Sequence, residues 1–186
     1  MIRFVSRHLL VLLIASVATA KLKNASVEDC AGANAPIRFL DGSISPDQIP
    51  IPGALNLEVA LDVLEDLPED LQLSLNLKKL DPDLTVPCLD GIGSCTYDVC
   101  PLFDVAGDLL CAIFPNPDEC QCPIPSGSYG TQPGSPLVLE VPYIDDIITA
   151  ILVGRFEGTM TFHRPSTPDE ALGCLLLKFE LIDGNP

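Results

Sequence analysis

Apolar and polar residues alternate along three stretches of the chain. In residues 54–62 and 71–78, leucine or valine occupies every second position, and mostly polar residues stand between them. Residues 175–181 repeat the pattern with leucine and phenylalanine. A period of two predicts β-strands that bury one face and expose the other. We therefore expect three strands that cover a common apolar interior.

Two further stretches are weaker strand candidates, and turn residues separate the candidates from one another. Residues 156–162 carry Phe156, Gly158, Met160 and Phe162 at alternate positions, and residues 137–141 form a short apolar run. The chain has 18 prolines, which fits a loop-rich sheet protein better than a helical one. Several short strands separated by turns predict an all-β sandwich or barrel.

Two segments depart from the period of two. Residues 102–114 are dense in apolar residues and include Cys111, so we expect a short helix that a disulfide ties down. In residues 144–152, isoleucine and leucine recur at intervals of three and four, which places one apolar stripe on a helix that follows Pro142. This helix either packs against the sandwich or forms an apolar flap on its rim that touches a membrane.

The first twenty residues have the layout of a secretory signal peptide. Arg3, Arg7 and His8 precede a short apolar run, Leu9 to Ala15, and the small residues Ala18 and Ala20 form a cleavage signal. The apolar run is shorter than the roughly 20 residues that span a bilayer. We therefore expect cleavage near Ala20. Residues 21–186 would then form a single domain, with its core at about residues 29–182.

Acidic residues outnumber basic ones by 26 to 10, and the formal net charge is −16. Such a chain repels nucleic acids and anionic membranes at neutral pH. Aspartate and glutamate ordinarily titrate at about pH 4, so an acidic compartment would neutralise much of the charge and let the protein approach an anionic bilayer. The alternative is that the charge only keeps the protein in solution.

All eight cysteines lie after the leader, which predicts four disulfides formed in an oxidising compartment. A zinc site is disfavoured, because six residues separate Cys88 from Cys95 and one separates Cys120 from Cys122, unlike the paired C-x-x-C of such sites. The sequence Asn24-Ala25-Ser26 predicts a glycan on Asn24.

The residues that catalysis commonly needs are scarce. After the leader the chain has one histidine, His163, which stands beside Arg164 and Pro165 and is expected in a surface turn. Residues 91–95 (GIGSC) lack the spacing of a nucleophile elbow, and neither a phosphate-binding loop nor a dinucleotide fingerprint occurs. We therefore expect no enzyme activity, no metal site and no cofactor.

The cysteine pattern and the sequence between the cysteines resemble the ganglioside GM2 activator family, part of the MD-2-related lipid-recognition superfamily. The segment Val86–Tyr97 (VPCLDGIGSCTY), followed by Cys100, carries most of the resemblance. It continues at Cys120-Gln121-Cys122-Pro123, at residues 136–142 (PLVLEVP) and at Gly173-Cys174, and near the start at Asp29-Cys30 and residues 49–53 (IPIPG). The resemblance spans nearly the whole domain.

The resemblance implies an immunoglobulin-like β-sandwich that forms a cup around an apolar cavity. It also implies the disulfides Cys30–Cys174, Cys88–Cys95, Cys100–Cys122 and Cys111–Cys120. Apolar side chains of the strands would line the cup, and the 144–152 segment would gate or dock it. The candidate lipid-binding residues are Leu139, Val141, Ile144, Ile147, Ile148, Ile151, Leu152, Phe156, Met160 and Phe162, with one face of the leucine-rich strands.

The function that the resemblance implies is that of a non-enzymatic, secreted or lysosomal lipid-transfer protein. Such a protein makes transient contact with a membrane, extracts a glycosphingolipid and presents its sugar to a β-hexosaminidase, which makes it an enzyme activator in ganglioside catabolism. The chain departs from the family in having no tryptophan, a longer segment after Pro142 and a shorter stretch between Cys100 and Cys120. These regions would select the lipid and the enzyme partner.

Two other functions remain open at this stage. The same sandwich would serve as a secreted module that binds a phospholipid, a sterol, a protein or an immune ligand without activating an enzyme. A hydrolase acting on phospholipid would instead place a polar cluster with His163 near the mouth of the cavity.

Overall fold

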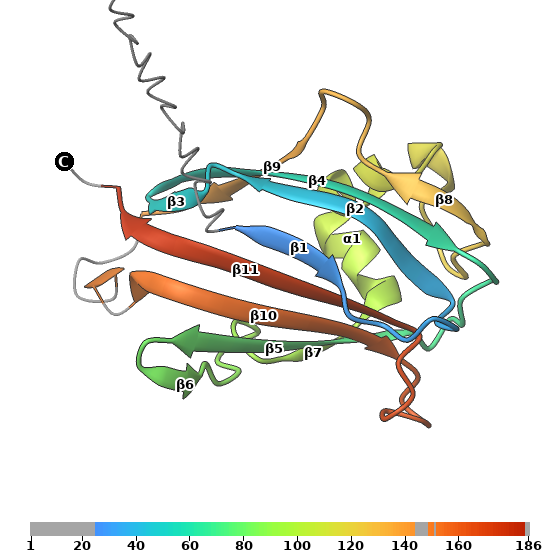
Figure 1. Cartoon of the computed structure of the whole chain (residues 1–186). Coiled ribbons are helices and arrows are strands. Elements are labelled where there is room, and N and C mark those ends of the chain that lie inside the picture. The colour runs from blue at the N-terminus through green and yellow to red at the C-terminus, as the bar shows by residue number, and fades with distance from the viewer. Residues whose placement is uncertain (1–24, 144–148, 151, 185–186) are drawn as a thin grey trace, which may run out of the picture.

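The computed structural model describes residues 25–143, 149–150 and 152–184, and two β-sheets face each other within it (Figure 1). The larger, seven-stranded sheet has the order β1-β11-β10-β5-β6, with β3 parallel to the end of β11 and β7 paired with β5. Its strands are β1 (Ser26–Asp29), β3 (Gln48–Ile51), β5 (Gln72–Leu80), β6 (Asp83–Thr85), β7 (Thr96–Asp98), β10 (Gly154–His163) and β11 (Gly173–Asp183).

The smaller, four-stranded sheet is built around one long strand. β4 (Gly53–Val63) pairs along one edge with β2 (Ile37–Ser45) and along the other with β8 (Gly127–Gly130) and β9 (Leu137–Val141), all antiparallel. The fold is therefore an all-β sandwich of two sheets. The strands predicted at residues 54–62, 71–78, 137–141, 156–162 and 175–181 are confirmed as parts of β4, β5, β9, β10 and β11.

β2 was not predicted because a bulge interrupts its alternation. Its pairing with β4 shifts register between Phe39 and Asp41, and the extra residue, Leu40, points outward with 61% of its surface exposed. A bulge places two residues of one strand opposite one of its partner. It thereby lets Phe39 face the interior while an apolar neighbour faces solvent. The short strand β3 was not predicted either, because it is four residues long and includes Pro50.

The predicted helix is present as α1 (Val99–Leu110), and the short 3₁₀ turns η1 (Cys111–Ile113) and η2 (Pro117–Glu119) follow it. α1 lies between the two sheets (Figure 1). Four disulfides staple the fold, Cys30–Cys174, Cys88–Cys95, Cys100–Cys122 and Cys111–Cys120. This is the pairing that the family resemblance implies. Two of them attach Cys100, in the first turn of α1, to Cys122 and Cys111, just after α1, to Cys120.

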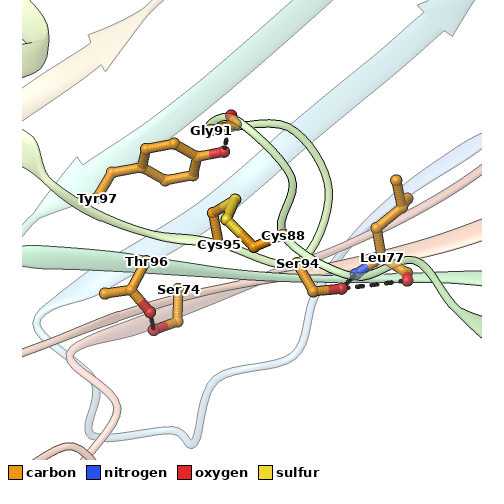
Figure 2. Close-up of a disulfide and its surroundings, with 8 residues drawn as sticks. All are labelled: Ser74, Leu77, Cys88, Gly91, Ser94, Cys95, Thr96 and Tyr97. Atoms are coloured by element: carbon orange, nitrogen blue, oxygen red, sulfur yellow. Dashed lines mark hydrogen bonds between the residues drawn. A yellow bond between two sulfur atoms is a disulfide. The ribbon is translucent and has the colours of Figure 1, made fainter.

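Figure 2 shows the Cys88–Cys95 disulfide, which closes a loop just before β7. β7 leads directly into α1. The Ser94 hydroxyl accepts a hydrogen bond from the Leu77 backbone N–H at 2.9 Å, and the Tyr97 hydroxyl donates to the Gly91 carbonyl at 2.9 Å. Ser74 and Thr96 join β5 to β7 through their hydroxyls, 2.8 Å apart. The start of α1 is therefore fixed to the larger sheet.

The two ends of the sandwich contain different cores. At the end where β11 finishes, Phe156, Ile49 and Ile51 are almost fully buried, and the rings of Phe156 and Phe179 stack with centroids 5.6 Å apart. At the other end, a second cluster includes Ile37, Val63, Leu71 and Phe114. Among the residues that the structure describes, no helix is long and apolar enough to cross a membrane.

Candidate functional site

A cavity of about 220 Å³ lies between the two sheets at the end occupied by α1. The smaller sheet forms one wall of it. Leu57, Val59, Leu61 and Val63 of β4 point into the cavity because alternate residues of a strand share a face. The polar residues between them, such as Glu58 and Asp62, lie on the opposite face.

The larger sheet forms the second wall in the same way. Leu73 of β5, Met160 and Phe162 of β10, and Leu175 and Leu177 of β11 line the cavity. Their register brings them together, since Phe162 stands opposite Leu73 and Met160 opposite Leu175. In the leucine-rich strands β4, β5 and β11, the odd-numbered residues therefore face the cavity.

The third wall comes from outside the sheets. Leu102, Phe103 and Leu110 of α1, with Phe114 just after η1, close the space between the sheet edges. The rings of Phe103 and Phe114 meet edge to face at 5.7 Å, and Phe114 meets Tyr129 of β8 in the same manner at 5.0 Å. This aromatic row links α1 to the smaller sheet.

The lining is apolar throughout. Of the described residues that border the cavity, Tyr129 alone has an oxygen or nitrogen atom in its side chain. Its hydroxyl donates to the Pro125 carbonyl at 2.6 Å, and burial raises the pKa of Tyr129, with smaller contributions from the nearby Asp66 and Glu119 carboxylates. The hydroxyl is thus neutral and already bonded, so the wall offers a ligand only hydrocarbon contacts.

The size of the cavity suits hydrocarbon. An apolar cavity of about 150 Å³ lined by leucine, isoleucine and phenylalanine stays dry and binds small apolar molecules. This cavity is larger and has the same kind of wall. Water gains few hydrogen bonds in such a space, whereas a methylene chain gains dispersion contacts on every side. The arrangement can therefore hold an apolar group while leaving any polar head group outside.

The structure brings only some of the candidate lipid-binding residues to this cavity. Met160 and Phe162 line it. Leu139 and Val141 lie on β9 opposite Leu55 and Gly53, beyond the cavity wall, and Leu137 of the same strand takes the lining position. Phe156 also lies outside the wall, because its ring stacks on Phe179 and faces the Lys79 ammonium at the other end of the sandwich.

The remaining candidates fall largely outside the described residues. Ile144, Ile147, Ile148 and Ile151 are among the residues that the structure does not describe, as are Asn24 and the leader. Leu152 is described and is half-buried, and Thr149 close by is 2% exposed. The apolar stripe on the 144–152 segment therefore stays a prediction.

The expectation that His163 lies in a surface turn is wrong. His163 is the last residue of β10 and is 5% exposed. Its Nδ1 donates to the Arg164 carbonyl at 3.1 Å, which leaves Nε2 to accept from the Ser74 hydroxyl at 2.7 Å in the neutral ring. Because neighbouring residues of a strand face opposite ways, Phe162 points into the cavity and His163 points away from it. His163 thus lies on the face of the larger sheet that points away from the cavity, whereas the hydrolase alternative requires it near the mouth of the cavity.

Sequence reasoning missed the wall formed by α1, although a signal for it was present. Val99, Leu102, Phe103 and Leu110 are spaced by three, four and seven residues, as one face of a helix requires. No local pattern in the sequence predicts that Phe39, Ile124 and Tyr129 line the cavity, because their positions depend on contacts between segments that are distant in the chain. Within the described part of the chain, no group of three or more His, Cys, Asp or Glu side chains is placed to hold a metal ion.

Comparison with known proteins gives one informative relative. The chain is 32% identical over 147 residues to a ganglioside GM2 activator from Macaca fascicularis, an alignment that covers 72% of this chain and 74% of that protein. No family model matches the chain. Among solved structures, a Niemann-Pick type C2 protein from the Japanese carpenter ant aligns with a TM-score of 0.47 and 13% identity, covering 84% of this chain and 99% of that one. That likeness is too low to support a functional argument.

Proposed function

This chain belongs to the ganglioside GM2 activator family, and on that premise we propose that it is a lipid-binding and lipid-transfer protein. The observation that carries the proposal is the apolar cavity between the sheets, whose walls offer hydrocarbon contacts and no free polar group. Each methylene group removed from water gains about 0.8 kcal/mol, so an acyl chain of about 18 carbons would gain on the order of 14 kcal/mol on full burial. Even partial burial of such a chain would hold a lipid in solution.

We further propose that the lipid is a glycosphingolipid and that its sugar is presented to a lysosomal β-hexosaminidase. The name of the relative, a ganglioside activator, supports this choice. An apolar cavity supports it too, because a sugar head group would stay outside, where a water-soluble hydrolase can reach it. In this proposal the protein performs no catalysis itself and makes only transient contact with the membrane.

The compartment forms part of the proposal. The leader would direct the chain to the secretory pathway, with cleavage near Ala20 and a glycan on Asn24. Four disulfides are consistent with an oxidising environment on that route. Delivery to the lysosome or export from the cell would follow.

Native mass spectrometry of protein secreted from eukaryotic cells, with extraction and identification of bound lipid, tests the proposal. We expect a one-to-one lipid adduct. The V59F variant should lose most of the adduct, because it places a ring in the cavity. The matched V138F variant, at a position 54% exposed on β9, should keep it. Absence of lipid from the wild-type protein, together with no uptake from liposomes at acidic pH, would overturn the lipid-binding proposal.

Stimulation of β-hexosaminidase on a ganglioside substrate at acidic pH tests the finer proposal. We expect the wild-type protein to accelerate hydrolysis of the membrane-bound ganglioside and not of a soluble substrate. A protein that carries lipid but gives no acceleration would be a lipid carrier without an activator role.

A further inference from the structure

Helix α1 is poorly stabilised for an element that forms a cavity wall. Ala106 has non-helical backbone angles, φ −134° and ψ 24°, which divide α1 into two short helical pieces. The N-cap residue Asp98 makes no side-chain cap in the described structure, since its carboxylate accepts instead from Gln72. Gly107 follows the break, and Asp108 stands near the C-terminal end, where the helix dipole disfavours an acid.

Both ends of this weak helix are nevertheless fixed. At the start, the Val99 N–H donates to the Leu71 carbonyl at 2.9 Å, and Cys100 is bonded to Cys122. Beyond the end, Cys111 is bonded to Cys120. A segment that is held at both ends and broken in the middle bends most easily at the break. The Ala106–Gly107 break is therefore the point where α1 is able to bend.

The break divides the cavity wall into two groups of side chains. Leu102 and Phe103 lie before it, and Leu110 and Phe114 lie after it. Contact across the break is made by the edge-to-face rings of Phe103 and Phe114, 5.7 Å apart. Bending at the break would separate these rings and open the wall between them.

Phe103 also borders a hollow on the surface. A surface hollow of about 690 Å³ lies on the outside of α1, bordered by residues 103–109 and by Cys111, Ala112 and Pro117. Of the residues described, Phe103 is the only one that borders both this hollow and the inner cavity. Phe103 is thus the described residue that the two spaces share.

We propose that α1 is the gate through which a hydrocarbon chain passes into the cavity. Bending at Ala106–Gly107 withdraws the Phe103 ring from Phe114 and joins the outer hollow to the inner cavity. The two disulfides keep the ends of α1 in place, so the gate closes again on the same wall. This inference rests on the proposed lipid-binding function, and it concerns the route and rate of loading.

Two substitutions should shift the gate in opposite directions. Gly107→Ala favours the helical backbone angles that residue 107 has in the closed structure. The added Cβ lies 3.6 Å from the Cys111 sulfur, which is an ordinary contact. The helix propensities of alanine and glycine correspond to about a four- to fivefold shift toward closure. Phe103→Leu removes the ring contact while keeping an apolar side chain, and the usual value of an aromatic pair corresponds to roughly a two- to tenfold shift toward opening.

The experiment combines hydrogen exchange of the α1 amides with the rate of lipid uptake. The probe is a ganglioside with a pyrene-labelled acyl chain, carried in phosphatidylcholine vesicles. Relative to wild type, G107A should exchange its α1 amides more slowly and take up probe more slowly, whereas F103L should do both faster. The controls are Gly32→Ala, which meets no atom within 4 Å, and Phe179→Leu, which removes a ring at the other end of the sandwich. Both should match wild type in α1 exchange and in uptake rate.

The outcomes separate the gate from the proposed function. Normal uptake by wild type with the same rate in G107A and F103L would overturn the gate and leave lipid binding intact. Unchanged exchange of the α1 amides in both variants would also overturn it. No uptake by any variant, even after long incubation, would overturn the lipid-binding function and the gate together.

Discussion

At one end of the sandwich the rings of Phe156 and Phe179 stack, whereas at the other end α1 stands between the sheets and leaves a cavity. The packed end is held by side-chain contacts. The cavity end has fewer such contacts, and three of the four disulfides attach to its wall: Cys30–Cys174 next to Leu175, and the two that fix α1 and η1. Covalent bonds thus hold the part of the molecule where close packing is incompatible with binding.

The largest effect is expected from removing Cys30–Cys174. This disulfide closes a loop with a sequence separation of 144 residues, so its loss should lower the free energy of unfolding by about 5 kcal/mol on the loop-entropy model. The C88S/C95S control opens a separation of only 7 residues and should cost about 2.5 kcal/mol. Urea denaturation of C30S/C174S and C88S/C95S measures the two losses of unfolding free energy, and equal losses would contradict the prediction.

Truncating a phenylalanine should cost more at the packed end than at the cavity end. Phe156→Ala removes a ring that is 2% exposed and should lower the unfolding free energy by about 3–5 kcal/mol. Phe162→Ala should cost about 1–2 kcal/mol less, because one side of its ring already faces the cavity and fewer contacts are lost. Thermal denaturation in the absence of lipid compares the two. A larger loss for Phe162 would show that the cavity end is the better packed.

Enlarging a side chain should also cost more at the packed end than at the cavity end. Ile51→Phe adds volume where the residue is 1% exposed and should destabilise by about 1–3 kcal/mol. Val59→Phe adds its ring to the free space of the cavity and should change stability by less than about 1 kcal/mol. Denaturation of lipid-free protein is the measurement. A strongly destabilised V59F variant would mean that the cavity is too small for a ring.

The smallest loss expected from removing a native contact concerns the hydroxyl at the cavity wall. Tyr129→Phe removes one hydrogen bond to Pro125 and should cost about 1 kcal/mol. Because the folded protein raises the pKa of Tyr129 above 10.0, the neutral phenol contributes stability that is complete below that pH and is lost as the pH rises through the folded value. Absorbance of tyrosinate, followed with unfolding measurements at alkaline pH, should show this loss in wild type and not in Y129F.

The strands were easier to predict from sequence than the position of the cavity between them. Alternation in β10 and β11 identified both strands, because one buried face leaves a period of two in the residues themselves. It did not identify which positions face a cavity and which face a packed core. Phe156 and Phe162 occupy the same face of one strand, and only the elements packed against them make their roles different.

Other features escaped because they depend on contacts between distant residues. The bulge at Leu40 hides β2 from a test for alternation. His163 is polar and adjoins a turn, so its burial depends on Ser74, a partner 89 positions away in the chain. The disulfide pairing likewise followed from the family resemblance, since eight cysteines alone allow many connectivities.

The cysteines around α1 also have a consequence for how the protein can be altered. Cys100–Cys122 closes residues 100–122 into a covalent ring, and Cys111–Cys120 closes a smaller ring inside it. A segment closed on itself in this way is a natural cassette, which can be replaced by another sequence of different length while the two sheets keep their own pairing. Exchanging residues 101–110 between relatives, with the four cysteines retained, would therefore be a direct way to graft a new portal onto an unchanged sandwich.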